Sequence, residues 1–143
     1  MSGPPPLPLT DTDGFFGVRF ESIGGLGAQL AGQILAEAAV MGMGYSGSVF
    51  SSYGSEKKGS PVKTYIRFGD PEKKVRVSSP IESPHLLAIF HEALITDEKV
   101  ISGLCSRGTI IVNSPMRPRA LRDQLGLSAQ TVGTVNAGAI ALE

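Results

Sequence analysis

Two short segments of the sequence contain the residues best suited to bind a ligand. The first is a glycine-rich turn, Ser22-Ile23-Gly24-Gly25-Leu26-Gly27, which leads into a helical pattern. Glycines let the backbone approach an anion closely, and the free amides at a helix N-terminus can donate hydrogen bonds to it. Gly24, Gly25 and Gly27 are therefore candidate contacts. The same glycines would also suit tight packing of a strand against the following helix.

The turn lacks two features of the common nucleotide-binding motifs. No Gly-Lys-Ser or Gly-Lys-Thr follows it to neutralise β- and γ-phosphates, as a P-loop requires. A dinucleotide fingerprint needs an acidic residue about 20 positions further on, where this chain has only serines and Tyr53. We therefore do not expect a nicotinamide site at the turn.

The second candidate segment is the polar loop of residues 53–61, Tyr53-Gly54-Ser55-Glu56-Lys57-Lys58-Gly59-Ser60-Pro61. Basic residues gather in this loop and after it: Lys57, Lys58, Lys63, Arg67, Lys73, Lys74 and Arg76. Such a concentration of positive charge can attract an anionic cofactor or an acidic subunit face, and a solvated surface is the ordinary alternative.

The other chemically reactive side chains do not form a recognisable site. His85 and His91 have no cysteine or carboxylate around them at the spacing of zinc ligands, so we predict no metal site. Cys105 has no histidine at a fixed motif spacing and is expected to be a small buried hydrophobe. No residue qualifies as an acid, base or nucleophile, so no catalytic residue is predicted.

Composition limits the classes of partner. A chain of 143 residues with 41% hydrophobic side chains is about one domain. Thirteen basic residues balance thirteen acidic ones, which argues against nucleic acid as a partner. The single Cys105 excludes an intrachain disulfide and a self-contained iron–sulfur cluster, and it fits a reducing compartment. With neither a membrane-spanning run nor a signal-peptide pattern, a cytoplasmic location without membrane attachment is expected.

The order of predicted elements indicates the fold class. Short β-branched or aromatic runs alternate with helical patterns, as in sheets built from βαβ units. Strands are expected at residues 15–20, 45–52, 62–68, 75–77, 86–90, 109–112 and 130–135. Helices are expected at residues 28–41, 92–104 and 118–125. We predict an α/β fold, a Rossmann-like layered sheet of mostly parallel strands with flanking helices and an added β-hairpin.

The added hairpin is expected to join residues 62–68 to residues 75–77, which would return as an antiparallel edge strand. Apolar and polar side chains alternate along residues 62–68, so one face of that strand should be buried and the other polar. This pattern places Lys63 and Arg67 on the exposed side, one on either side of Tyr65.

Residues 1–13 are expected to form a proline-rich N-terminal arm, separate from a single domain at residues 14–143. Their prolines lack an amide donor and fix φ, which excludes helix and central strand. The arm is either a disordered leader or a polyproline segment that lies on a partner subunit.

The glycine turn and the polar loop occur in the order and at the separation found in a known family. Gly24-Gly25-Leu26-Gly27 and the alanine-rich segment 28–39 resemble the Gly-x-Gly-Gly-Gln-Gly turn and helix that open the gamma domain of pyruvate and other 2-oxoacid:ferredoxin oxidoreductases. Residues 53–61 and the strand ending at Arg67 resemble that family's Tyr-Gly-Pro-Glu-x-Arg-Gly-Gly loop and its downstream arginine. The resemblance covers about residues 15–143.

The chain departs from the family's motifs at five positions: Ser22, Leu26, Ser55, Lys58 and Ser60. The family has arginine where this chain has Lys58. An arginine fork can bind a carboxylate or phosphate with two hydrogen bonds, whereas lysine is a point charge. These departures point to an unusual substrate branch or to a mainly structural domain.

The resemblance implies a part in thiamine-diphosphate-dependent oxidative decarboxylation of a 2-oxoacid. In that family, electrons pass through [4Fe-4S] clusters to ferredoxin, usually with transfer of the acyl group to coenzyme A. Thiamine diphosphate, Mg²⁺ and the clusters are expected in thiamine-binding and ferredoxin-like partner subunits, with no cofactor bound by this chain alone. Ferredoxin is the expected acceptor, and coenzyme A is a candidate co-substrate.

The resemblance assigns cofactor-binding or subunit-interface roles to nine residues: Gly24, Gly25, Gly27, Tyr53, Gly54, Glu56, Lys58, Gly59 and Arg67. The isolated chain is expected to be inactive. Two other classes stay open: a nucleotide-binding domain of another oxidoreductase, and a non-catalytic structural or assembly subunit. Family members continue beyond the point that corresponds to Glu143, so we expect a chain truncated at its C-terminus.

Overall fold

The computed structural model describes residues 3–24, 27–54 and 60–143, and these residues build one six-stranded sheet. The strands are β1 (Phe16–Ile23), β2 (Ser46–Tyr53), β3 (Pro61–Gly69), β4 (Leu86–Ile89), β5 (Thr109–Asn113) and β6 (Thr131–Val135). Their order across the sheet is β2-β3-β1-β4-β5-β6. Neighbouring strands from β1 to β6 run parallel, whereas β3 is antiparallel to both β1 and β2. The predicted α/β class with a mostly parallel sheet is confirmed.

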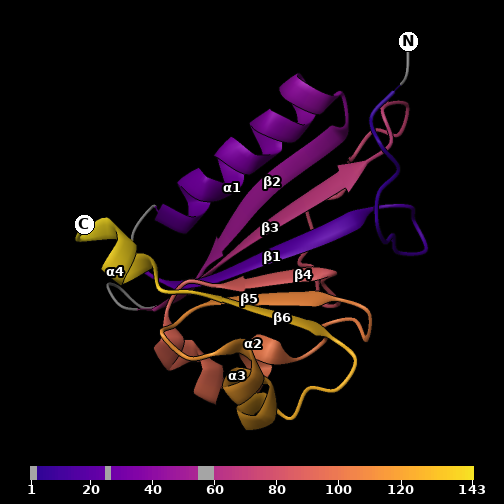
Figure 1. Cartoon of the computed structure of the whole chain (residues 1–143). Helices are drawn as coiled ribbons and strands as arrows, with labels where there is room; N and C mark the ends of the chain where they lie inside the picture. Colours follow the sequence, from indigo (N-terminus) through magenta and orange to yellow (C-terminus); the bar gives the residue numbers. More distant parts are fainter. Residues whose placement is uncertain (1–2, 25–26, 55–59) are drawn as a thin grey trace.

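The helices cover different halves of the two sheet faces (Figure 1). They are α1 (Gly27–Glu37), the π-helical turn η1 (Ala38–Gly42), the 3₁₀ turn η2 (Glu92–Thr96), α2 (Glu98–Ile101), α3 (Pro118–Leu125) and α4 (Ala137–Ala141). Helix α1 packs on β1, β2 and β3, while α2 and α3 lie on the opposite face against β4, β5 and β6. The chain therefore changes faces of the sheet between β1 and β4.

Two hydrophobic clusters match these two halves. Between α1 and its strands lie buried residues that include Val18, Phe20 and Ile66. Under α2 and α3 lie the apolar side chains of β4 and β5, including Leu87 and Ile110, which are fully buried. Parallel strands need apolar residues where helices cover them, and the continuous apolar runs of β4 and β5 meet that need.

The strand that pairs with β3 in a hairpin is not the predicted one. Residues 75–77 are not a strand, and β3 pairs instead with β2, from Ser46 opposite Gly69 to Tyr53 opposite Val62. The other edge of β3 is taken by β1. With both edges of β3 occupied, residues 75–77 cannot pair with that strand, so the prediction of an edge strand there was wrong.

The predicted exposed face of β3 is also buried. Tyr65 is 5% exposed and Arg67 is 9% exposed, while Lys63 is half-buried. The alternation of side chains between two faces is correct, but the segment around residues 79–82 crosses the polar face. Arg67 Nη1 donates to the carbonyl of Ser79 at 2.7 Å, which fastens that segment to the strand.

Two predicted helices differ in form. The helix expected at residues 92–104 is divided at Asp97, whose carboxylate accepts from the Lys99 amide at 2.9 Å and caps α2. The helix expected at residues 28–41 ends in the π-helical turn η1. Both elements exist where the pattern predicts them, and their ends are set by local hydrogen bonding.

The described part of the N-terminal arm, residues 3–13, has no helix or strand. Leu7 packs on the cluster beneath α1, and the Tyr45 hydroxyl donates to the Pro5 carbonyl. The arm therefore lies on its own domain in this structure. The division into an arm and one domain at residue 14 stays a prediction.

Replacing Gly103 by alanine should destabilise the fold by roughly 2 kcal/mol or more. Gly103 has φ of +85°, and a Cβ there would lie 1.8 Å from the Glu82 carbonyl oxygen, so the backbone must move. Gly126 is the matched control, since its φ is +66° but no described atom lies within 4 Å of such a Cβ. Gly126→Ala should therefore cost only about 1 kcal/mol of left-handed strain. Urea unfolding measures both values, and equal losses would contradict the predicted clash.

Candidate functional site

The strands that run parallel to β1 end along one edge of the sheet, called here the carboxyl edge. Ile23 ends β1, Asn113 ends β5, and His91 and Asn136 follow the ends of β4 and β6. Tyr53 ends β2, which runs in the same direction because both β1 and β2 are antiparallel to β3. In open α/β sheets, ligands bind outside the carboxyl ends where the connections change face. The position between β1 and β4 is such a point.

A crevice of about 400 Å³ opens at this edge. It is lined by Ile23, Phe90, His91, Glu92, Ala93, Asn113, Pro115, Asn136 and Gly138. His91 Nδ1 accepts from the Ile23 amide at 3.1 Å, which joins β4 to the end of β1. With Nδ1 accepting, a neutral His91 ring carries its proton on Nε2.

Asn113, at the end of β5, forms two hydrogen bonds across the same crevice. Its Nδ2 donates to the Phe90 carbonyl at 3.1 Å, and its Oδ1 accepts from the Ala137 amide at 3.0 Å. Asn136 caps α4 by accepting from the Ala139 amide at 3.2 Å. These bonds hold the ends of β4, β5 and β6 in one rigid arrangement.

An apolar hollow of about 240 Å³ adjoins the crevice and shares Phe90 and Asn113 with it. The hollow is lined by Ala88, Ile89, Phe90, Ile111, Asn113, Val135 and Ala137. Ile111 alternates with the two β5 residues that pack under α2 and α3, so its side chain faces the opposite side of the sheet. The carboxyl edge thus places an apolar surface beside a polar one.

Four of the predicted contact residues lie at the carboxyl edge. Gly24 follows β1 and donates its amide to the Ser60 carbonyl at 3.1 Å, and Gly27 begins α1. The Tyr53 hydroxyl, at the end of β2 beside Gly54, donates to the side-chain oxygen of Gln29 on α1. Gly25, Glu56, Lys58 and Gly59 lie outside the described residues.

Steric packing does not account for Gly27. A Cβ at this position would meet no described atom within 4 Å, although packing against the strand was the ordinary explanation for the glycines of this turn. The described atoms give no steric reason for glycine at this position, and its contact role stays a prediction.

Arg67 is not brought to this edge. It pairs with Gly17 in β1, whereas Pro61 pairs with Ile23, so Arg67 lies six residues along β3, about 20 Å at 3.3 Å per residue. Its guanidinium donates to the carbonyls of Ser79 and Pro80. In this structure Arg67 secures a crossing segment of its own chain.

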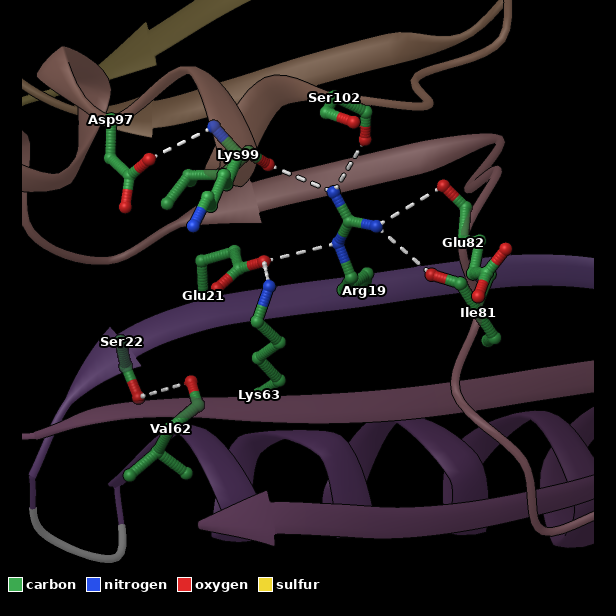
Figure 2. A network of polar contacts seen from close by, with 11 residues as sticks. Arg19, Glu21, Ser22, Val62, Lys63, Ile81, Glu82, Asp97, Lys99 and Ser102 are labelled. Atoms are coloured by element: carbon green, nitrogen blue, oxygen red, sulfur yellow. Dashed lines mark hydrogen bonds and ion pairs between the residues drawn. The ribbon is translucent and has the colours of Figure 1, made fainter. Parts of the chain in front are cut away.

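A buried ionic network in β1 was missed by the sequence analysis (Figure 2). Arg19 is 4% exposed and Glu21 is fully buried. Arg19 Nε lies 3.1 Å from Glu21 Oε1, and Lys63 Nζ from β3 lies 3.0 Å from the same oxygen. The guanidinium also donates to four backbone carbonyls, those of Ile81 at 2.9 Å, Glu82 at 3.3 Å, Val100 at 2.8 Å and Ser102 at 3.0 Å. Two charges two residues apart in an otherwise apolar strand were the available signal.

The pKa of Glu21 is shifted in opposite directions by burial and by neighbouring charges. Burial raises the pKa of the carboxyl, while the hydrogen bond from Lys63 and the charges of Lys63 and Arg19 lower it, and the net direction is upward. Glu21 Oε2 has no hydrogen-bond partner among the described residues. The network therefore fixes geometry at an electrostatic cost rather than supplying a free reactive group.

His85 is buried at the start of β4 and acts structurally. Its Nδ1 accepts from the Gly17 amide at 2.9 Å, and its ring stacks on Phe16 with centroids 5.4 Å apart. Burial lowers the pKa of His85, against a smaller effect of the Asp11 charge. Cys105 is partly buried, with its Sγ 3.5 Å from the Ser83 carbonyl oxygen.

Neither a metal-ligand cluster nor a membrane-spanning helix is found in the part of the chain that the structure describes. No three or more histidine, cysteine, aspartate or glutamate side chains come together there to hold a metal ion. No described helix has the length and apolar character needed to cross a membrane.

The chain is similar to proteins of one family. The family model described as pyruvate ferredoxin/flavodoxin oxidoreductase matches residues 17–143. Pyruvate synthase subunit PorC of Thermotoga maritima is 32% identical over 129 residues, which cover 90% of this chain and 65% of that protein. The common gamma subunit of the pyruvate/ketoisovalerate oxidoreductases of Thermococcus litoralis is 32% identical over 126 residues, which cover 88% of this chain and 66% of that protein.

A solved structure supports the same relationship. The crystal structure of the Thermotoga maritima pyruvate oxidoreductase subunit PORC matches with a TM-score of 0.75 and 29% identity, over 90% of this chain and 66% of that one. The present chain thus spans 65–66% of the length of these relatives.

Replacing Arg19 by methionine should lower the free energy of unfolding by about 3–5 kcal/mol, because Glu21 and four carbonyls lose their buried partner. Arg122 is the control, since it is only partly buried and donates to one carbonyl, that of Ser128. Arg122→Met should cost less than about 1 kcal/mol. Urea unfolding compares the two variants. A loss for Arg19→Met as small as that for Arg122→Met would contradict a central role for the network.

Lowering the pH should destabilise the protein through His85. The pKa of folded His85 lies below the unfolded value of about 6.5, so the unfolded state takes up the proton first as the pH falls. This contribution to stability is complete above the unfolded pKa and is lost as the pH falls toward the folded pKa. The urea midpoint of the wild type should therefore fall between about pH 7 and pH 5 more than that of His85→Asn, which keeps an acceptor but does not titrate.

The raised pKa of Glu21 acts in the opposite direction but is common to both proteins, so their difference reports on His85. Identical pH dependence in the wild type and in His85→Asn would contradict this role.

Proposed function

The chain belongs to the pyruvate ferredoxin/flavodoxin oxidoreductase family, and from this premise we propose that it is the gamma-type component of a 2-oxoacid:ferredoxin oxidoreductase. Such an enzyme decarboxylates a 2-oxoacid oxidatively and passes the electrons to ferredoxin. The relatives support this proposal, since one is a subunit of pyruvate synthase and another is a gamma subunit common to pyruvate and ketoisovalerate oxidoreductases.

The observation that carries the proposal is an apolar surface on α1 and α4 that the described residues leave uncovered. Leu30 and Ile34 on α1 are 55% and 59% exposed, and Met41 in the following turn is 84% exposed. Ile140 and Leu142 at the C-terminal end are 64% and 90% exposed. Leu30 and Ile34 are four residues apart, so they form a stripe on one face of α1, and Met41 lies in the π-helical turn that follows. Exposed apolar surface of this kind marks contact with another protein.

This apolar surface lies next to the carboxyl edge. Helix α1 begins there, directly after the end of β1, and α4 begins there after β6 (Figure 1). Of the residues of α1, only Glu37 carries a charge, which leaves little to keep the helix surface solvated. A partner covering α1 and α4 would also close the crevice that holds His91 and Asn113.

In this proposal the chain supports chemistry that takes place in its partners. Thiamine-binding and ferredoxin-like subunits hold thiamine diphosphate, Mg²⁺ and [4Fe-4S] clusters, and ferredoxin accepts the electrons. The described residues of this chain offer no metal-ligand cluster of their own. The carboxyl edge would orient a partner's bound group or a co-substrate such as coenzyme A, and would exclude water from it.

Within this role, the residues of the glycine turn and polar loop are proposed as contacts with the partner or its cofactor: Gly24, Gly25, Gly27, Tyr53, Gly54, Glu56, Lys58 and Gly59. Arg67 lies too far along β3 to join them and is left out of the contact set. A cytoplasmic location is part of the proposal, because the lone Cys105 fits a reducing compartment.

The proposal is tested by tagging the full chain in its native host and purifying it without oxygen. We expect thiamine- and iron–sulfur-bearing subunits to co-purify, and the assembly to reduce an artificial electron acceptor when a 2-oxoacid is supplied. Assembly without 2-oxoacid-dependent activity would favour a non-catalytic assembly subunit. A monomer without partners or activity would contradict the proposal.

Replacing Ile34 by lysine should reduce recovery of the partner subunits at least tenfold, roughly 1.4 kcal/mol, because a charge would enter the apolar stripe. Val77 is the control, since it is also apolar and β-branched, is 39% exposed, and lies on the loop after β3. Val77→Lys should leave recovery unchanged. Co-purification followed by quantitative mass spectrometry measures both. Equal recovery for the two variants would show that the stripe on α1 is not the contact surface.

A further inference from the structure

A polar pocket lies beside the buried ionic network, on the sheet face opposite α1. It has a volume of about 260 Å³ and is lined by Arg19, Lys63, Tyr65, Pro80, Ile81, Glu82, Lys99 and Ser102. We propose that this pocket binds a small oxyanion, a carboxylate or phosphate group, through the Tyr65 hydroxyl and the ammonium groups of Lys63 and Lys99. The site shares no residue with the crevice at the carboxyl edge and does not depend on the proposed function.

Tyr65 provides the strongest indication. Only 5% of the residue is exposed, and its side chain lines the pocket beside Arg19 and Lys63. Its ring is held by stacking on Phe50 from β2, with centroids 5.0 Å apart. An acceptor inside the pocket would take a hydrogen bond from this hydroxyl, which is otherwise open to water there.

The Tyr65 hydroxyl is available as a donor. Burial raises the pKa of Tyr65, and the nearby charge of Glu21 acts in the same direction. The group therefore keeps its proton at neutral pH. A protonated phenol can donate a hydrogen bond to an anion and carries no negative charge that would repel it.

Two ammonium groups complete the donor set. Lys63 is oriented by its 3.0 Å contact with Glu21, while Lys99 lies on α2 directly after the cap at Asp97. Figure 2 shows the two side chains coming from opposite sides of the network, Lys63 from β3 and Lys99 from α2. An oxyanion between them would accept charge-assisted hydrogen bonds from two elements.

The charge balance favours an anion. The lining contains three cations, Arg19, Lys63 and Lys99, against one carboxylate, Glu82. Glu21, beside Arg19 and Lys63, and Asp97, whose charge also acts on Glu21, lie outside the lining, so the excess of positive charge belongs to the pocket wall itself. Arg19 already donates to four carbonyls, so the ligand would be bound by the lysines and Tyr65.

The size of the pocket limits the ligand. Sites for whole cofactors enclose roughly 300–1,000 Å³, and this pocket, at about 260 Å³, is smaller. A single phosphate or a short carboxylate is therefore the chemical class that fits, either free or as the end of a longer molecule whose remainder stays outside.

The proposal is tested by isothermal titration calorimetry of the full chain at constant ionic strength. Inorganic phosphate and acetate are the two probes, each titrated with sodium chloride as the compensating salt. We expect saturable binding at one site for at least one probe. Phosphate binding alone would identify a phosphate site, and acetate binding alone a carboxylate site. No saturable heat with either anion would overturn the proposal.

Two variants assign the binding to this pocket. Tyr65→Phe removes only the hydroxyl and keeps the ring that stacks on Phe50, so the fold should be kept. Lys99→Met removes one ammonium and leaves the Glu21 network intact. Each should weaken binding at least tenfold, whereas Lys74→Met, an exposed lysine on the loop after β3, should not. Equal affinity in the wild type and Tyr65→Phe would overturn the proposal.

Discussion

The arrangement of the domain depends on one buried guanidinium. Arg19 projects from the middle of β1 and donates to carbonyls of two separate segments, at residues 81–82 and at residues 100 and 102. The first segment precedes β4 and the second lies at the end of α2, so neither is held in place by sheet pairing. The close approach of Gly103 to Glu82 brings the same two segments together. Arg19 therefore ties the half of the sheet under α1 to the half under α2 and α3.

Strand β4 pairs directly with β1, and the residues that follow β4 line the candidate site. His85 accepts from the Gly17 amide where β4 begins, and His91 accepts from the Ile23 amide just beyond its end. Both bonds join the strand to β1, one at each end. The crevice between His91 and Asn113 is consequently a rigid feature, whereas the exposed side chains of α1 and α4 beside it supply the apolar surface for a partner.

The sequence predicts the architecture and the neighbourhood of the site, but not its internal contacts. Element order correctly indicates an α/β sheet, and the start of the glycine turn and Tyr53 lie at one edge because β1 and β2 both end there. Alternation along β3 shows which residues share a face but not what covers that face, so Tyr65 and Arg67 were taken as exposed. The edge partner of β3 could not be read from local pattern, because pairing with β2 or with residues 75–77 satisfies the same periodicity.

The contacts of the buried charged residues and of the histidines were the least predictable from the sequence. Arg19 and Glu21 break an apolar run, and only the three-dimensional arrangement shows that each finds its partner in a distant segment. His91 belongs to no sequence motif, and its hydrogen bond is to a residue 68 positions away in sequence. Such contacts depend on the register of neighbouring strands, which a single sequence does not specify.

The most direct test of the account is hydrogen–deuterium exchange of this chain, compared between the purified assembly and the chain alone. We expect slower exchange in the assembly for the peptides that contain α1, α4 and the residues following β4 and β5, because a partner covers the carboxyl edge. The loop of residues 70–78, at the other end of the sheet, should be unchanged. Protection confined to that loop, with α1 and α4 exchanging as in the free chain, would contradict the proposed contact surface.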